Sequence, residues 1–353
     1  GIRIDTANIH KASDEADDDL KPLFDKLYEM AGRELNPNSP KQIKEYFYDH
    51  LGIPAIKDKG KITTGEVAMK KLSAMGVKEA SIILSIRKLR KLKGTYLDMK
   101  FRPDGRFATS FKPVGTKNGR LSSAKTIQGY GGNSQNLPYV VKQYYLADEG
   151  YLIYEIDLSQ AENRLMAYIS PELEMIKAFE AGIDIHTKTA SLVLSKPIDQ
   201  ISDEKGSCSL GNGTKSERYW GKTSNHSFNY DLGYRSAAER FELSTREAQS
   251  LINAYHRAYP GIHKYHNWVR EELSQNGRKI TNLMGRTRKF LGRWQDSLFK
   301  EAYNFIPQST VADIINQCGL INIYYNQDKF GDVELLNQVH DSIVFQIPIS
   351  IGM

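Results

Sequence analysis

The sequence has 353 residues, of which 40% are hydrophobic and 25% charged, and its net charge is +6. A chain of this length predicts two or three packed units, and its composition is that of a soluble globular protein. No run of about 18 apolar residues occurs, so we predict no membrane span, and the opening Gly1-Ile2-Arg3 is not a secretory signal. Cys208 and Cys318 form no CxxC pair and no zinc set, so we predict reduced thiols in a cytosol-like compartment. The positive charge is compatible with a polyanionic partner but does not identify one.

Residues 1–98 are predicted to be mainly helical. Apolar residues recur at helical spacing in Lys11–Met30 and Pro40–Leu51, and Ser39 followed by Pro40 is typical of a helix start. Gly60–Gly65 is predicted to be an exposed loop.

A further helix is predicted over Ala80–Leu97, and its polar face is almost entirely basic. The basic residues are Arg87, Lys88, Arg90, Lys91 and Lys93. Such a face is either simply solvated or contacts nucleic-acid phosphates, and the sequence alone leaves both readings open.

From Phe101 the pattern changes to strands and loops. Gly129–Asn136 is predicted to be a loop, and the apolar run Tyr151–Ile156 a buried strand. A helical pattern resumes at Leu158 and continues to about Tyr325.

Three segments depart from this helical pattern. Ser202–Glu217 is predicted to be a mobile surface loop, and Gly285–Gly292 a basic turn. Val333–Ile347 alternates around His340 and Asp341, which predicts a β-hairpin with those two residues at its bend.

Two carboxylates occupy positions suited to metal binding. Asp157 follows the strand Tyr151–Ile156 and precedes a helix, and Asp341 lies at the hairpin bend. Asp157 could equally cap that helix, and Asp341 could stabilise an Asx-type turn. If the strands are neighbours in one sheet, both carboxylates can share two divalent cations for in-line phosphoryl transfer. The sequence cannot show that adjacency.

Arg218, Lys222, His226 and Tyr230 recur every four residues, so we predict that they line one helix face. Two cations followed by two rings suit a triphosphate followed by a sugar and base, and Lys222 could neutralise charge as the bond breaks. An exposed basic stripe is the alternative.

Polar residues in other loops and helices form a fourth group. They are Arg120 in Gly119-Arg120-Leu121-Ser122-Ser123, Gln135 with Asn136, and Asn304 with Gln308. Arginine and amide side chains can bind base edges and phosphates, although each could also serve as a structural hydrogen-bonding residue.

Together these segments resemble the family A DNA polymerases (DNA polymerase I type) along nearly the whole chain and in the family's order. Leu89-Arg90-Lys91-Leu92-Lys93-Gly94-Thr95-Tyr96 is similar to the family's primer–template-gripping helix. Asp157 to Arg164 matches motif A, Arg218 to Tyr230 motif B, and Val339-His340-Asp341 motif C. The resemblance implies an α+β right-hand fold with a helical thumb, an antiparallel β-sheet palm and helical fingers.

The resemblance also implies a role for each matching residue. Asp157 and Asp341 would bind two Mg²⁺ ions, which Mn²⁺ can replace. Lys222 would assist catalysis and, with Arg218 and the nearby His186, hold the incoming triphosphate. The remaining nucleotide contacts would come from Gln160, Glu162, His226 and Tyr230, with Glu162 as the steric gate that excludes ribonucleotides and bonds Tyr230.

The implied partners are a DNA primer–template and dNTPs, with accessory proteins unidentified and no membrane. DNA contacts would come from Lys91, Lys93, Arg120, Gln135, Asn136, Asn304, Gln308 and His340. The implied domains are a thumb over 1–98, the first part of the palm over 99–163, the fingers over 164–312, and the second part of the palm over 313–353.

Several positions depart from the family's pattern. His226 replaces the usual Phe or Tyr, Asp231 the usual Gly, and Ser342 a common Glu, and the loop before Arg218 is longer than usual. These departures suggest a viral or phage protein, which implies the cytoplasm of a bacterium or an infected host. The chain contains no predicted proofreading segment and ends soon after Asp341, so we expect an excerpt of a longer polymerase.

Two other functions remain open. A single-subunit RNA polymerase would share both Asp residues and the Arg–Lys–Tyr helix, but Glu162 leaves no room for a 2′-hydroxyl. A catalytically silent nucleic-acid-binding module would keep the fold and bind primer–template, but it would not extend the primer when metal ions are supplied.

Overall fold

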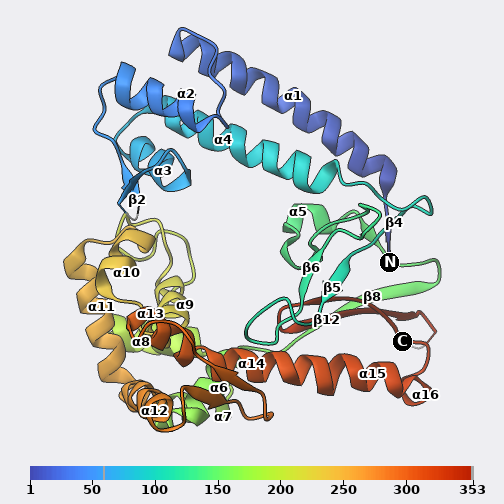
Figure 1. The fold of residues 1–353 in the computed structure, drawn as a ribbon, viewed down its shortest axis with the longest axis vertical. Helices are drawn as coiled ribbons and strands as arrows, with labels where there is room; N and C mark the ends of the chain where they lie inside the picture. The colour runs from blue at the N-terminus through green and yellow to red at the C-terminus, as the bar shows by residue number, and fades with distance from the viewer. Residues whose placement is uncertain (59, 351–353) are drawn as a thin grey trace. The chain divides into compact units, whose positions relative to one another are not determined.

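The computed structural model describes residues 1–58 and 60–350, and the chain divides into two compact units. Unit 1 comprises Gly1–Phe111, Ser123–Tyr154 and the chain from Phe345 onward, and unit 2 comprises Lys112–Ser122 and Glu155–Val344. The mixture of helices and small sheets confirms the predicted α+β class (Figure 1).

Helices and short strands both contribute to unit 1. Its helical segments are α1 (Thr6–Ala31), α2 (Pro40–Lys44), η1 (Glu45–His50), α3 (Glu66–Ala74), α4 (Lys78–Leu92), η2 (Lys93–Leu97), η3 (Ser134–Asn136) and α5 (Tyr139–Lys142). Its strands are β1 (Ile2–Ile4), β2 (Lys57–Asp58), β3 (Lys61–Ile62), β4 (Arg106–Phe107) and β7 (Tyr145–Leu146). Strands β5 (Ser110–Lys112), β6 (Ser122–Ala124), β8 (Tyr151–Asp157) and β12 (Ser342–Pro348) continue from one unit into the other.

The N-terminal helices form as their sequence patterns predict. Asp5 caps α1 by accepting a hydrogen bond from the Asn8 backbone N–H, and Ser39 caps α2 in the same way through Gln42. Helix α4 runs alongside α1 in Figure 1, and apolar residues of the two helices are buried, Leu27 and Ile83 among them. Residues 45–50 and 93–97 are π-helical, so both predicted helices end in a wider turn.

The predicted burial of the strand at Tyr151–Ile156 is wrong. Strand β8 was expected to be buried, but it is largely exposed, with Leu152 at 41% and Ile156 at 58%. The strand lies at the edge of a three-stranded sheet of order β11-β12-β8, so its apolar side chains gain less cover than a central strand would have.

Unit 2 is mainly helical. Its helical segments are α6 (Ala161–Ile169), α7 (Leu173–Glu180), α8 (Ile185–Leu194), η4 (Ile198–Gln200), α9 (Glu217–Phe228), α10 (Tyr234–Phe241), α11 (Thr245–Ala258), α12 (Gly261–Gln275), α13 (Asp296–Tyr303), α14 (Phe305–Asp313), η5 (Ile314–Ile321), α15 (Asn322–Tyr325) and α16 (Gln327–Phe330). Its strands are β9 (Lys279–Thr281), β10 (Thr287–Lys289) and β11 (Glu334–Val339).

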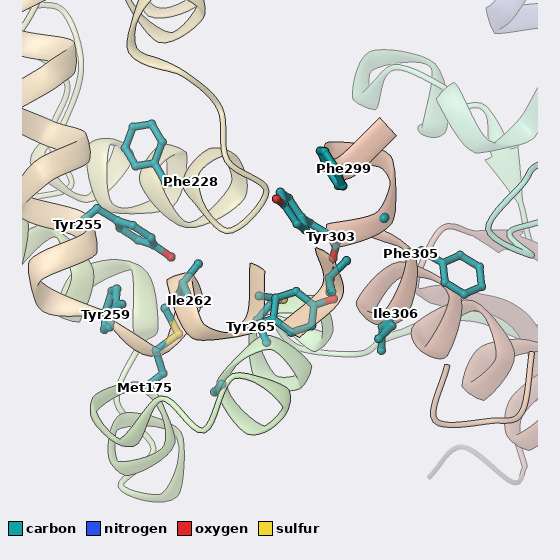
Figure 2. Packing of buried hydrophobic residues seen from close by; sticks show 14 of the residues in the cluster. Met175, Phe228, Tyr255, Tyr259, Ile262, Tyr265, Phe299, Tyr303, Phe305 and Ile306 are labelled. Atoms are coloured by element: carbon teal, nitrogen blue, oxygen red, sulfur yellow. Dashed lines mark hydrogen bonds between the residues drawn. The ribbon is translucent and has the colours of Figure 1, made fainter. Parts of the chain in front are cut away.

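A large aromatic core holds the helices of unit 2 together. Figure 2 shows Phe228 of α9, Tyr255 of α11, Tyr265 of α12, Tyr303 of α13 and Phe305 of α14 within this core. All five are at most 2% exposed, so the positions of α9 and α14 are fixed by extensive apolar burial.

Helices α8 and α9 pack unusually closely. A Cβ at Gly221 would lie 2.0 Å from the His186 carbonyl oxygen and 2.7 Å from the Ala190 nitrogen. Only glycine therefore permits this approach, which brings the side chains of the two helices into hydrogen-bonding range.

Two other expectations are tested by unit 2. The hairpin with His340 and Asp341 at its bend is confirmed by β11 and β12. The prediction of one helix face from Arg218 to Tyr230 holds only in part, because α9 ends at Phe228 and Tyr230 lies in the turn that follows.

No helix in the described part of the chain has both the length and the apolar character needed to cross a bilayer.

Candidate active site

The structure brings Asp157 and Asp341 together. Asp157 is the last residue of β8, and Asp341 lies in the turn between β11 and β12, where β12 is the neighbour of β8. The Leu158 backbone N–H donates to the Asp341 carbonyl oxygen at 3.1 Å. Asp157 is not a helix cap, because α6 begins at Ala161 and its N-cap residue is Gln160.

Negative charge is concentrated at this point. Desolvation raises the pKa of Asp157, and repulsion from Asp341 and Glu155 raises it further. Glu155 accepts a hydrogen bond of 2.9 Å from Ser342 Oγ. A divalent cation would offset this repulsion, so the donor set suits Mg²⁺, which prefers carboxylate oxygens and retains waters. No group of three or more His, Cys, Asp or Glu side chains among residues 1–58 and 60–350 forms a metal cage.

Glu162 is held between two partners from distant parts of the sequence. One carboxylate oxygen forms a short ion pair with Arg120, and the other accepts a hydrogen bond of 2.6 Å from the Tyr230 hydroxyl. Burial, followed by the charge of Glu162, raises the pKa of Tyr230 well above its usual value, so this phenol remains a donor. The predicted Glu162–Tyr230 bond is therefore present.

Arg218 also has a carboxylate partner. Its guanidinium donates two hydrogen bonds to Asp184, at 2.9 and 3.1 Å, and Asp203 lies 3.7 Å away. Burial disfavours the charged form of Asp184, but hydrogen bonds from Arg218 and Thr187 outweigh it and lower the pKa of Asp184. Asp184 also caps α8, so it ties Arg218 to that helix.

His186 and His226 lie beside one another, with ring centroids 5.6 Å apart. Burial lowers the pKa of His186 to about 4, and it also lowers the pKa of His226. Arg218 and Lys222 are close enough to add to this effect on His186. Lys222 itself is exposed, so this part of the site contains an accessible amine and two neutral imidazole rings.

Asn304 and Gln308 meet a residue that the sequence did not single out. Asn118 Nδ2 donates to Gln308 Oε1 at 2.8 Å and approaches Asn304 Oδ1 at 3.4 Å, while Arg288 donates to Asn118 Oδ1 at 3.0 Å. Asn118 lies two residues before Arg120, and that proximity was the only sequence signal that could have identified it. Asp184, the partner of Arg218, was missed as well, because nothing in the sequence marks a carboxylate 34 residues from its partner.

Two further predicted residues have unusual backbones. Gln160 has φ +55° and a buried Oε1 with no hydrogen-bond partner in the described part of the chain. His340 has φ +54° and is exposed at the hairpin bend, where its carbonyl accepts a bond from Gln338 Nε2 at 2.5 Å. Non-glycine residues in this conformation are uncommon and concentrate at functional sites.

The remaining predicted DNA contacts belong to unit 1. Gln135 is buried and Asn136 is exposed. Lys91 is exposed, whereas Lys93 bonds Ser13 Oγ and forms ion pairs with Asp17 and Asp98. The basic face predicted over Ala80–Leu97 is therefore not uniformly free for phosphate.

Arg87, on the same face, has a structural role. It donates to the carbonyls of Pro37 and Thr64, each at 2.8 Å. These bonds join the helix to two neighbouring loops.

Comparisons with known proteins identify the family of this chain. A family model described as DNA polymerase family A matches residues 6–351. DNA polymerase I of Helicobacter pylori (strain ATCC 700392 / 26695) is 30% identical over 98% of this chain and 38% of its own length. The thermostable DNA polymerase I of Thermus aquaticus is 28% identical over 99% of this chain and 42% of its own length. The chain thus spans about two fifths of the length of these curated relatives.

A solved structure is similar over the entire chain. It is the POL domain of Pol1 from M. smegmatis in complex with DNA primer-template and dNTP, with 26% identity and a TM-score of 0.88. The match covers 100% of this chain and 62% of that one. It confirms the predicted α+β polymerase fold.

Proposed function

Because this chain belongs to DNA polymerase family A, we propose that it catalyses template-directed addition of dNTPs to a primer 3′-hydroxyl, with release of pyrophosphate. The observation that carries the proposal is the adjacency of Asp157 and Asp341, joined through the 3.1 Å bond from Leu158 N to Asp341 O. Asp157 and Asp341 would hold two Mg²⁺ ions, which when bound activate the hydroxyl and neutralise the triphosphate. Mn²⁺ would substitute for Mg²⁺.

The incoming triphosphate would lie against α8 and α9. Arg218 and Lys222 supply positive charge, and His186 supplies a neutral ring beside them. Lys222 would stabilise the charge that develops on the leaving pyrophosphate. The Asp184 contact would orient the Arg218 guanidinium toward phosphate, as a carboxylate orients a histidine at other sites.

Glu162 would select the sugar. A carboxylate held by both Arg120 and Tyr230 cannot rotate away from a bulky 2′-substituent, so ribonucleotides would be excluded. Gln160 would contact the nucleotide, and His226 would stack on the incoming base.

DNA would contact both units. In unit 2 we assign Arg120, Asn304, Gln308 and His340 to the primer–template near the growing end. Asn118 would support Asn304 and Gln308, because it forms hydrogen bonds with both. In unit 1 we assign Gln135, Asn136, Lys91 and Lys93. Lys93 would exchange its ion pairs with Asp17 and Asp98 for a phosphate.

The domain assignment rests on the same resemblance. We propose a thumb over 1–98, a palm over 99–163 and 313–353, and fingers over 164–312. The last three residues of the second palm segment lie outside the described residues.

Primer extension tests the proposal. A labelled primer on a DNA template is incubated with Mg²⁺ and either dNTPs or rNTPs, using the parent chain and Asp341→Ala. Extension with dNTPs that disappears in Asp341→Ala is the expected result. Tight primer–template binding without extension would instead indicate a silent binding module, and equal use of rNTPs would overturn the role of Glu162.

A further inference from the structure

A buried chain of hydrogen bonds links the core of unit 2 to the ring of His186. The Tyr259 hydroxyl lies 2.8 Å from Thr189 Oγ1, and Thr189 Oγ1 donates to Asn225 Oδ1 at 3.0 Å. Asn225 Nδ2 lies 3.1 Å from His186 Nδ1. Tyr259, Thr189 and Asn225 are each 0% exposed, so water cannot replace these partners.

The direction of these bonds is fixed by the chemistry of the amide. Asn225 Oδ1 receives the Thr189 hydroxyl proton, and Asn225 Nδ2 also faces the Ile185 carbonyl oxygen at 3.5 Å. Only the orientation with the NH₂ group toward Ile185 and His186 satisfies both contacts. The Tyr259 hydroxyl then donates to Thr189 Oγ1, since the Thr189 proton is already committed.

This orientation determines the tautomer of His186. An amide NH₂ can only donate, so His186 Nδ1 must be the unprotonated acceptor, and the ring proton lies on Nε2. The opposite tautomer would place two N–H groups 3.1 Å apart. No group in the described part of the chain hydrogen-bonds to Nε2, which leaves that N–H available to a ligand.

We propose that Asn225 is a positioning residue that keeps His186 neutral and in the Nε2–H form, so that His186 donates a hydrogen bond to a phosphate oxygen of the incoming nucleotide. The charged groups around His186 agree with this role: Arg218, Lys222 and His226 disfavour a further positive charge, while Asp184 favours one. The site thus contains two cations, Arg218 and Lys222, that would neutralise phosphate charge, and one neutral donor, His186, whose hydrogen bond would orient the phosphate. This inference rests on the proposed function for its ligand.

The first test reads the tautomer without any nucleotide. Long-range ¹H–¹⁵N spectra of the full chain at pH 7 are recorded for the parent, His186→Gln, Asn225→Asp and Asn163→Asp. His186→Gln identifies the His186 signals among the 8 histidines. We expect the Nε2–H pattern in the parent and a Nδ1–H or doubly protonated ring in Asn225→Asp, because a carboxylate can only accept.

Asn163→Asp is the matched control. Asn163 is 3% exposed and accepts a hydrogen bond from Asn229 Nδ2 at 2.9 Å, so a carboxylate can keep that bond. This variant should leave the His186 signals unchanged even if it lowers stability. A parent ring that is protonated on Nδ1 at pH 7 would overturn the inference.

The second test measures dNTP affinity in a complex with Mg²⁺ and a dideoxy-terminated primer–template. Asn225→Asp should weaken dTTP binding about 10- to 150-fold, the range for one hydrogen bond to a charged group. In the His186→Gln background the same change should have little further effect. Equal weakening in both backgrounds would show that Asn225 acts by another route. A parent chain that binds no dNTP would refute the proposed function, whereas the spectra would still decide the role of Asn225.

Discussion

Replacing Tyr230 with phenylalanine removes one hydroxyl and leaves the ring in place. That hydroxyl donates to Glu162 at 2.6 Å, and the Glu162 side chain is only 19% exposed. Hydrogen bonds to charged groups contribute about 1.5–3 kcal/mol, so we expect Tyr230→Phe to lower the free energy of unfolding by that amount. Because Arg120 still binds the other carboxylate oxygen, Glu162 should remain in the site but be held less firmly.

The same change should weaken sugar selection. If the lost bond fixes Glu162 in the gate, the preference for dNTPs over rNTPs should fall by up to the same free energy, or roughly 10- to 150-fold. The ratio of kcat/KM for dCTP and CTP measures this directly, and urea denaturation measures stability. A double-mutant cycle with Glu162→Ala measures the interaction free energy between Tyr230 and Glu162.

Tyr265→Phe is the control for loss of a buried hydroxyl. The Tyr265 hydroxyl donates to the neutral Tyr303 carbonyl at 2.8 Å, so this variant should lose only about 0.5–1.5 kcal/mol and keep its sugar selection. A coupling energy below about 0.5 kcal/mol between Tyr230 and Glu162, with unchanged selection in Tyr230→Phe, would refute the reasoning.

Three further predictions concern unit 2. Gly221→Ala should destabilise the chain by about 1–3 kcal/mol or more in urea denaturation, because the new Cβ would lie 2.0 Å from the His186 carbonyl; a neutral effect would contradict the close packing of α8 and α9. Phe228→Ala should lose about 3–5 kcal/mol by the same measurement, since Phe228 is 0% exposed in the aromatic core of Figure 2, and a loss below about 1 kcal/mol would show that the core collapses around the site. Burial, with repulsion from neighbouring histidines, lowers the pKa of His256 to about 4, so its contribution to stability is complete above about pH 6.5 and is lost as the pH falls toward 4. We expect the free energy of unfolding to fall by about 1–2 kcal/mol between pH 7 and pH 5, a range that allows for the partial exposure of His256. The fall should be smaller in His256→Phe, and an equal fall in both proteins would show that another group causes it.

The sequence predicted those features that depend on local pattern. The N-terminal helices, the final hairpin and the positions of Asp157 and Asp341 at strand ends follow from periodicity, capping and turn chemistry. The bond between Glu162 and Tyr230 was predicted from the resemblance alone, because no spacing rule links residues that lie 68 positions apart.

Other features depend on tertiary contacts that have no local signature. The exposure of β8 follows from its place at the edge of a sheet, which its apolar composition does not encode. Helix α9 ends at Phe228, so the four-residue spacing that continues to Tyr230 does not continue as helix. Asn118, Asp184 and Asn225 act through partners that lie far from them in the sequence, and a single amide or carboxylate gives no sign of such a partner.

The order of synthesis on a ribosome gives the sheet that carries Asp157 a particular difficulty. Among the described residues, β12 is the only neighbour of β8 in that sheet, yet nearly all of unit 2 is translated between them. Strand β8 therefore emerges with neither edge paired, and the edge that β12 covers in the folded chain stays unpaired until Ser342–Pro348 follows. An unpaired edge of this kind can pair with another chain, so the nascent protein depends on folding quickly or on being shielded until β12 has been translated.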